Sequence, residues 1–138
     1  MTVYDYTPGG CPIMDPLSES LPSGSKWAAK KRRRVQRQKQ RDDAKLVRTA
    51  RDFRRGILGD GSPHRMCAVI CYPLCTLLLQ SGVRCRIETL YFRSHPTLKN
   101  HVVLRLWDNR ILDPTADQFD GMPDVYLGDF PELFQHWA

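Results

Sequence analysis

The chain has 138 residues, 41% of them hydrophobic, and a formal net charge of +6, which suits one small domain with a non-globular extension. It has no run of about 18 apolar residues, so we do not expect a membrane-spanning helix. Its N-terminus lacks a basic segment followed by an apolar one, so we do not expect a secretory signal. Its five cysteines form no CxxC pair, which argues against a disulfide framework and a zinc site. We therefore expect a cytoplasmic protein, without a metal, another cofactor or a membrane contact, that enters a nucleus only in a eukaryotic host.

Residues 1–25 contain four of the ten prolines and three of the nine glycines. Such a stretch has little to bury, so we predict an extended or disordered leader. Residues 26–55 differ sharply from the rest of the chain, because they carry 14 Lys and Arg against 3 Asp. Their net charge is +11, whereas the remainder of the chain has a net charge of −5.

A basic helix is expected over residues 26–58, with Ser25 as its N-cap and no Gly or Pro before Gly56. Its second half should pack on a core through residues at helical spacing, namely Leu46, Val47, Ala50, Phe53 and Ile57. Its first half has only Val35 to bury, so we predict a solvated arm or a binding segment within residues 26–41.

The candidate binding residues of this arm are Lys30, Lys31, Arg32, Arg33, Arg34 and Arg37. Clustered Lys and Arg neutralise phosphates, so nucleic acid leads as a possible partner, with an acidic protein as the alternative. Apart from Trp27 no aromatic residue interleaves the run, so base stacking is not indicated. Lys30–Arg34 also resembles a nuclear-import patch.

Residues 59–138 should form the folded domain. The pattern predicts a helix over 67–81 that ends at Gly82, strands over 83–93, 101–107, 110–114 and 125–127, and a terminal helical turn over 131–137. Pro73 indicates that the first of these helices either starts later than Cys67 or is kinked. One helix on a small antiparallel sheet, with flanking helices, is an α+β domain.

Cys67, His101 and Asp113 follow one another in the order of a thiol-nucleophile triad. A thiolate is the attacking species, and a helix N-terminus or a nearby imidazolium lowers a thiol's pKa. Cys67 is expected at such an N-terminus. Cys71 and Cys75 lie one and two turns further along, where they should be small core residues.

The register of the hairpin bears on the same triad. Leu112 shares a sheet face with Leu104 and Leu106 only if the connecting loop has an odd number of residues, most simply three. The same register puts His101 and Asp113 on one face, opposite or diagonal to each other, whereas a two-residue turn would separate them. Asp113 before Pro114 could alternatively serve only to start a turn.

Four segments, Cys67-Ala68-Val69, Leu77–Gly82, His101–Leu104 and Leu112–Phe119, resemble the transglutaminase-like branch of the papain-like cysteine fold. The resemblance covers about residues 60–128. It implies Cys67 as nucleophile, His101 as base and Asp113 as the residue that orients the His. Some deamidating members use a Gln after the Asp as an oxyanion donor, which makes Gln118 a candidate.

The resemblance implies a cysteine hydrolase, protease, deamidase or acyltransferase that acts on an amide or ester carbonyl, most simply of a protein or peptide. The main alternative is a catalytically inactive module that acts through its basic helix, because Arg65-Met66 stands where the family often has a small-polar pair. A thiol-dependent inhibitor or scaffold is a third possibility. His64 is a competing base, and His95 and His136 are expected at the surface. Oligomeric state stays open.

Overall fold

The computed structural model describes residues 25–138, so the predicted leader up to residue 24, with Cys11, lies outside the described residues. The chain divides into two compact units, Met1–Lys45 and Leu46–Ala138. Helices combine with one four-stranded antiparallel sheet, which confirms the predicted α+β class. No helix within residues 25–138 is both long enough and apolar enough to cross a membrane.

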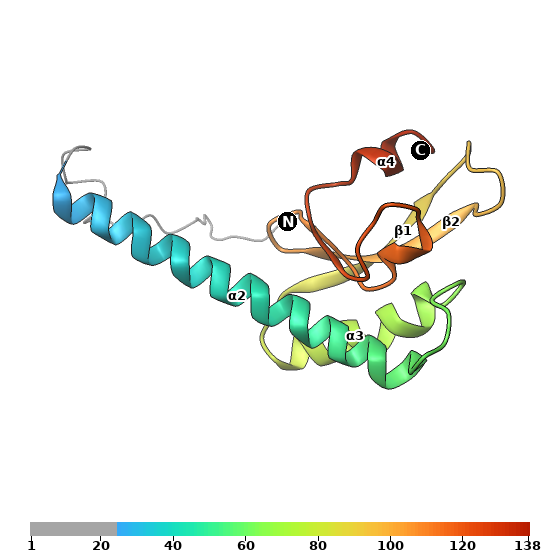
Figure 1. The fold of residues 1–138 in the computed structure, drawn as a ribbon, viewed down its shortest axis with the longest axis horizontal. Helices are drawn as coiled ribbons and strands as arrows, with labels where there is room; N and C mark the ends of the chain where they lie inside the picture. Colours follow the sequence, from blue (N-terminus) through green and yellow to red (C-terminus); the bar gives the residue numbers. More distant parts are fainter. Residues whose placement is uncertain (1–24) are drawn as a thin grey trace. The chain divides into compact units, whose positions relative to one another are not determined.

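Helix α2 runs from Lys26 to Leu58 (Figure 1). Ser25 caps it as predicted, since its Oγ accepts the backbone N–H of Ala28 at 3.0 Å. Residues 32–42 are all exposed. Because this stretch has one apolar side chain, Val35, which is itself 60% exposed, it contributes no core contact.

The second half of α2 contributes an apolar stripe to the Leu46–Ala138 unit. Leu46 and Ala50 are buried, and Val47 and Phe53 pack against the same cluster. Ile57 was predicted to join them, but it stays 38% exposed and outside the cluster. The packed stripe ends at Phe53, one turn earlier than the sequence pattern suggested.

Helix α3 runs from Cys67, its predicted first residue, to Gln80 and contains Pro73, so the alternative of a later start is excluded. Pro73 is tolerated because it lies on the exposed side of the helix, where water can reach the backbone. Gly82 ends the helix as predicted, with φ of 89°. The N–H of Gly82 donates to Leu79 O at 3.1 Å and that of Val83 to Leu78 O at 2.9 Å, the two bonds of a Schellman motif.

The sheet has the order β1-β2-β3-β4, and each strand is antiparallel to its neighbour. Its strands are β1 (Cys85–Tyr91), β2 (Asn100–Leu106), β3 (Ile111–Asp113) and β4 (Tyr126–Gly128). A short 3-10 helix, η1 (Ala116–Gln118), follows β3, and helix α4 (Glu132–Gln135) follows β4. The positions of all four strands agree with the sequence pattern, with ends shifted by one to two residues.

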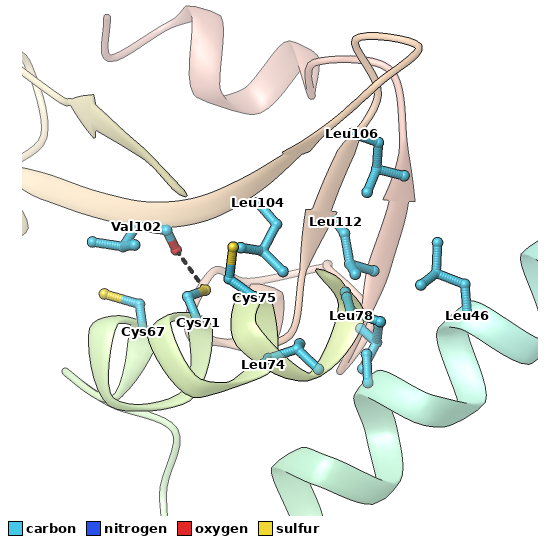
Figure 2. Close-up of a cluster of buried hydrophobic side chains, with 12 residues drawn as sticks. Leu46, Cys67, Cys71, Leu74, Cys75, Leu78, Val102, Leu104, Leu106 and Leu112 are labelled. Carbon is cyan, nitrogen blue, oxygen red and sulfur yellow. Dashed lines mark hydrogen bonds between the residues drawn. The ribbon is translucent and has the colours of Figure 1, made fainter. Parts of the chain in front are cut away.

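Each face of the sheet carries its own core. Helix α3 covers one face, where Cys71, Leu74 and Leu78 pack with Leu104 and Leu112 (Figure 2). Helix α4 lies on the opposite side (Figure 1). The core there is formed by Leu90, Phe92, Val103, Ile111, Phe119 and Phe134.

The β2–β3 connection has the three residues that the burial of Leu112 requires. Leu104 pairs with Leu112, and the N–H of Leu106 donates to Arg110 O at 2.9 Å, which leaves residues 107–109 as the loop. Asn109 has φ of 70°, a left-handed conformation that Asn adopts more readily than most residues. The predicted register is thereby confirmed.

Candidate active site

Cys67 is the first residue of α3, so the unpaired N–H groups of the first turn and the positive end of the helix dipole lie beside its side chain. It comes first in the row Cys67, Cys71 and Cys75 along the side of α3 that faces β2 (Figure 2). Its exposure is 9%, against 0% for Cys71. Cys71 and Cys75 are buried core residues, as predicted, and the thiol of Cys71 donates to Val102 O at 3.4 Å.

His101 and Asp113 come from the adjacent strands β2 and β3. Their Nε2 and Oδ2 atoms lie 2.7 Å apart, and both side chains are fully buried. Continuing the Leu104–Leu112 register places Asp113 opposite Val103, and therefore diagonal to His101. The two residues are thus brought together by the register that the sequence argument required.

The second carboxylate oxygen of Asp113 is held by Thr115. Oδ1 accepts the Thr115 backbone N–H at 3.0 Å and its hydroxyl at 3.3 Å, and Thr115 is fully buried. A carboxylate that accepts the N–H two residues on forms an Asx turn. Asp113 therefore starts a turn and also binds His101. The sequence had offered these two functions as alternatives, and the geometry of Asp113 includes both contacts. Thr115 was not predicted as a site residue, although Asp-Pro-Thr is a sequence that favours this turn.

Aromatic rings enclose the His101 imidazole. Phe92 is stacked on it, with ring centroids 6.1 Å apart and an interplanar angle of 23°. Phe119 and Phe134 present their edges, with centroids at 4.9 and 5.7 Å. Phe92 and Phe134 were not predicted as site residues, because neither lies in a motif and only the folded chain places their rings against His101.

The free ring nitrogen of His101 is the notable polar atom of the site. Among residues 25–138, Nδ1 is the buried side-chain nitrogen or oxygen that has no hydrogen-bond partner of standard geometry. Burial lowers the pKa of His101, but its hydrogen bond to Asp113 and its interaction with Cys67 together raise that pKa to about 9. The imidazole therefore holds a proton readily at neutral pH.

The pKa of the Cys67 thiol is lowered, whereas that of His101 is raised. Burial raises its pKa, but interaction with His101 and backbone hydrogen bonds at Val102 and Ala68 outweigh burial, so that the pKa of Cys67 lies below the ordinary value. Burial raises the pKa of Cys71 well above that value and, together with Cys75, raises the pKa of Cys85 to about 12. Of these three cysteines, Cys67 is therefore the one that loses its thiol proton most readily.

Gln118 connects the loop before α3 to η1. Its Nε2 donates to Thr115 Oγ1 at 2.9 Å and to Thr115 O at 3.3 Å, while its Oε1 accepts the backbone N–H of Arg65 at 3.3 Å. Arg65 has φ of 61°, a left-handed conformation that is uncommon for a residue other than Gly. The predicted oxyanion donor therefore lies near the start of α3, with its amide hydrogens directed to Thr115.

Arg54 of α2 clamps the segment that follows Asp113. Its guanidinium binds both carboxylate oxygens of Asp117 at 2.6 Å and donates to Pro114 O at 3.2 Å and to Asp124 O at 2.9 Å. Only 14% of the Arg54 side chain is exposed. In sequence Arg54 resembles the other basic residues of the helix, so this contact, which spans 60 residues or more, was not predicted.

The remaining histidines lie outside the Cys67–His101–Asp113 arrangement. His64 is exposed, and His101 is the imidazole that lowers the pKa of Cys67. His136 is exposed as predicted, whereas His95 is only partly exposed. His95 is half-buried because its Nδ1 accepts the N–H groups of Thr97 and Leu98 and its ring packs on Trp137 at 4.5 Å.

The predicted basic residues Lys30, Lys31, Arg32, Arg33, Arg34 and Arg37 all lie on α2, within the Met1–Lys45 unit. None of them belongs to the unit that holds Cys67, His101 and Asp113. In the described part of the chain, no group of three His, Cys, Asp or Glu side chains is arranged to hold a metal ion.

Comparison of the chain with protein-family models, with curated proteins and with solved structures finds no match.

Proposed function

We propose that this protein is a thiol-nucleophile enzyme that attacks an amide or ester carbonyl through Cys67, His101 and Asp113, on a transglutaminase-like variant of the papain-like fold. One observation carries the proposal. A fully buried His101–Asp113 pair, 2.7 Å apart, leaves Nδ1 without a standard hydrogen bond, while the same imidazole lowers the pKa of Cys67 at a helix N-terminus. A buried pair with one unsatisfied atom is costly unless it has a use.

Each side chain has a defined role in the proposed reaction. His101 takes the Cys67 proton on Nδ1, and Asp113 Oδ2 holds the proton on Nε2 and stabilises the imidazolium. The Cys67 thiolate then adds to the substrate carbonyl carbon. Collapse of the tetrahedral intermediate expels the amine or alkoxide, which receives the proton from His101, and leaves a thioester on Cys67. Water or an amine resolves that thioester, so the outcome is hydrolysis, deamidation or acyl transfer.

The developing oxyanion needs hydrogen-bond donors. The backbone N–H of Cys67 at the start of α3 is the first donor that we propose, because N–H groups of a first turn have no partner within the helix. Gln118 is the second candidate. For that role its amide would have to exchange a bond to Thr115 for one to substrate. A protein or peptide is the substrate class that we favour.

The proposed function is tested with p-nitrophenyl acetate, a small activated ester. We expect a burst of about one equivalent of nitrophenolate, followed by slow turnover, and an acetyl group on Cys67 in the intact mass and peptide map. Cys67→Ala should abolish the burst and His101→Ala should slow it strongly. The matched control is Cys75→Ala, which removes a thiol of the same helix outside the proposed triad.

A burst that survives Cys67→Ala, or acetylation spread evenly over cysteines and lysines, would rule out this function. The inactive-module alternative would then be favoured. That alternative predicts binding that persists in Cys67→Ala and depends on the basic half of α2.

A further inference from the structure

The exposed basic half of α2 has a regular arrangement of charge that the proposed reaction does not use. Lys30, Arg33, Arg34, Arg37 and Arg41 are all exposed and recur at helical spacing. At about 3.6 residues per turn they fall within an arc of roughly 100°, so they form one line of cations along the helix. We call these five residues the basic face.

No acidic residue interrupts the basic face. Residues 30–41 contain eight Lys and Arg and no Asp or Glu, and the first carboxylates along the helix are Asp42 and Asp43. With a rise of about 1.5 Å per residue, the basic face extends over roughly 16 Å. A nucleic acid duplex carries about one phosphate charge per 1.7 Å of its axis with both strands counted, so a duplex segment of this length carries roughly ten phosphates, of which a helix on one side contacts a part.

The composition of residues 30–43 favours a nucleic acid duplex over a lipid surface or a single strand as the polyanion that binds there. A helix that lies on a lipid surface needs an apolar face to insert, and residues 30–43 offer Val35 alone. Single-stranded nucleic acid is usually held by aromatic stacking, and residues 30–43 contain no aromatic side chain. Phosphates on the outside of a duplex require only a line of exposed cations.

We propose that the basic face binds the phosphate backbone of double-stranded nucleic acid without sequence preference. Arg predominates, with four of the five positions, and its planar guanidinium matches phosphate oxygens in a bidentate geometry. The affinity arises from release of condensed counterions, so it falls steeply with salt. This proposal is independent of the Cys67 reaction.

The test measures anisotropy of a fluorescein-labelled 20-base-pair DNA duplex titrated with the full-length chain at several salt concentrations. With five phosphate contacts, the slope of log K against log salt should be about −4.5. The variant Arg33→Gln/Arg34→Gln/Arg37→Gln should lose at least about tenfold in affinity at 0.1 M salt, and its slope should become shallower by about 3. Gln preserves helix propensity, and circular dichroism verifies the helix.

The matched control is Lys39→Gln/Arg84→Gln/Arg93→Gln, which removes the same number of exposed positive charges from residues that are not part of the basic face. It should retain most of the affinity and most of the slope. Equal losses in both variants would show that net charge alone is responsible, and would overturn the proposal. So would binding of phosphatidylserine vesicles or of poly-glutamate at concentrations where the duplex is not bound.

Discussion

The imidazole of His101 and the carboxylate of Asp113 form a fully buried pair, with Nε2 and Oδ2 2.7 Å apart. Neither group can exchange its partner for water without opening the core of Phe92, Phe119 and Phe134. Removal of one member of a buried pair is destabilising because the other is left without compensation. The consequences of this pair for stability and reactivity can be measured separately.

The pH dependence of stability should reveal the pair. In the folded chain the pKa of His101 is raised to about 9, above its unfolded value of about 6.5, so the folded state binds the extra proton between these limits. The contribution is complete below about pH 6.5 and is lost as pH rises through about 9. Cys67→Ala has no thiolate at residue 67 and also loses the part of the His101 pKa shift that comes from Cys67. We therefore expect its urea unfolding free energy to fall as pH rises from about 6.5, over a narrower window than in the unsubstituted chain.

Asp113→Asn in the same Cys67→Ala background should flatten that pH dependence, because without the carboxylate burial again lowers the pKa of His101. At pH 6 we expect a loss of roughly 3 kcal/mol relative to the Cys67→Ala parent. An unchanged slope would show that another group is responsible for the titration.

Arg54→Ala should destabilise the segment after Asp113 by about 2 kcal/mol, because Pro114 O, Asp117 and Asp124 O all lose a donor. Esterase activity at Cys67 should fall with it. Arg54→Lys should recover only part of the loss, since an ammonium cannot reproduce the bidentate contact with Asp117.

Arg55→Ala is the matched control for Arg54, because its ion pair with Asp52 is 68% and 62% exposed. Exposed pairs contribute little, so we expect a change within about 0.5 kcal/mol by urea denaturation. Similar losses for the two variants would contradict a clamping role for Arg54.

Arg65 precedes α3 in a left-handed conformation, with φ of 61°. Arg65→Gly and Arg65→Ala remove the same charge, and both retain the backbone N–H that binds Gln118. Gly adopts this conformation without strain, so we expect Arg65→Gly to be more stable than Arg65→Ala by about 0.5–1 kcal/mol. Thermal or urea unfolding of the two variants provides the measurement, and a more stable Arg65→Ala would show that the loop relaxes away from this conformation.

Local signals in the sequence predicted the elements well. Ser25 and Gly82 predicted the start of α2 and the end of α3, and the burial of Leu112 predicted the three-residue loop that places Asp113 diagonal to His101. These features depend on capping chemistry and on strand periodicity, which act over a few residues.

Contacts across long sequence separations could not be predicted in the same way. Arg54 looks like any other basic residue of α2, and Phe92 like any core aromatic. Their roles depend on which element packs against which, and their partners lie on other elements of the fold. Ile57 was predicted to be in the core because it continues the apolar stripe of the helix. The spacing of that stripe does not show where the surface against which the helix packs comes to an end, and Ile57 is in fact exposed.

The activation of Cys67 by His101 is tested by the rate of iodoacetamide labelling at each cysteine as a function of pH. We predict that Cys67 reacts first, with an apparent pKa below the ordinary thiol value of about 8.5, and that His101→Ala removes this advantage. Cys71 should stay protected, because burial raises its pKa. Equal labelling of all cysteines, or a Cys67 rate unchanged by His101→Ala, would contradict the proposed triad.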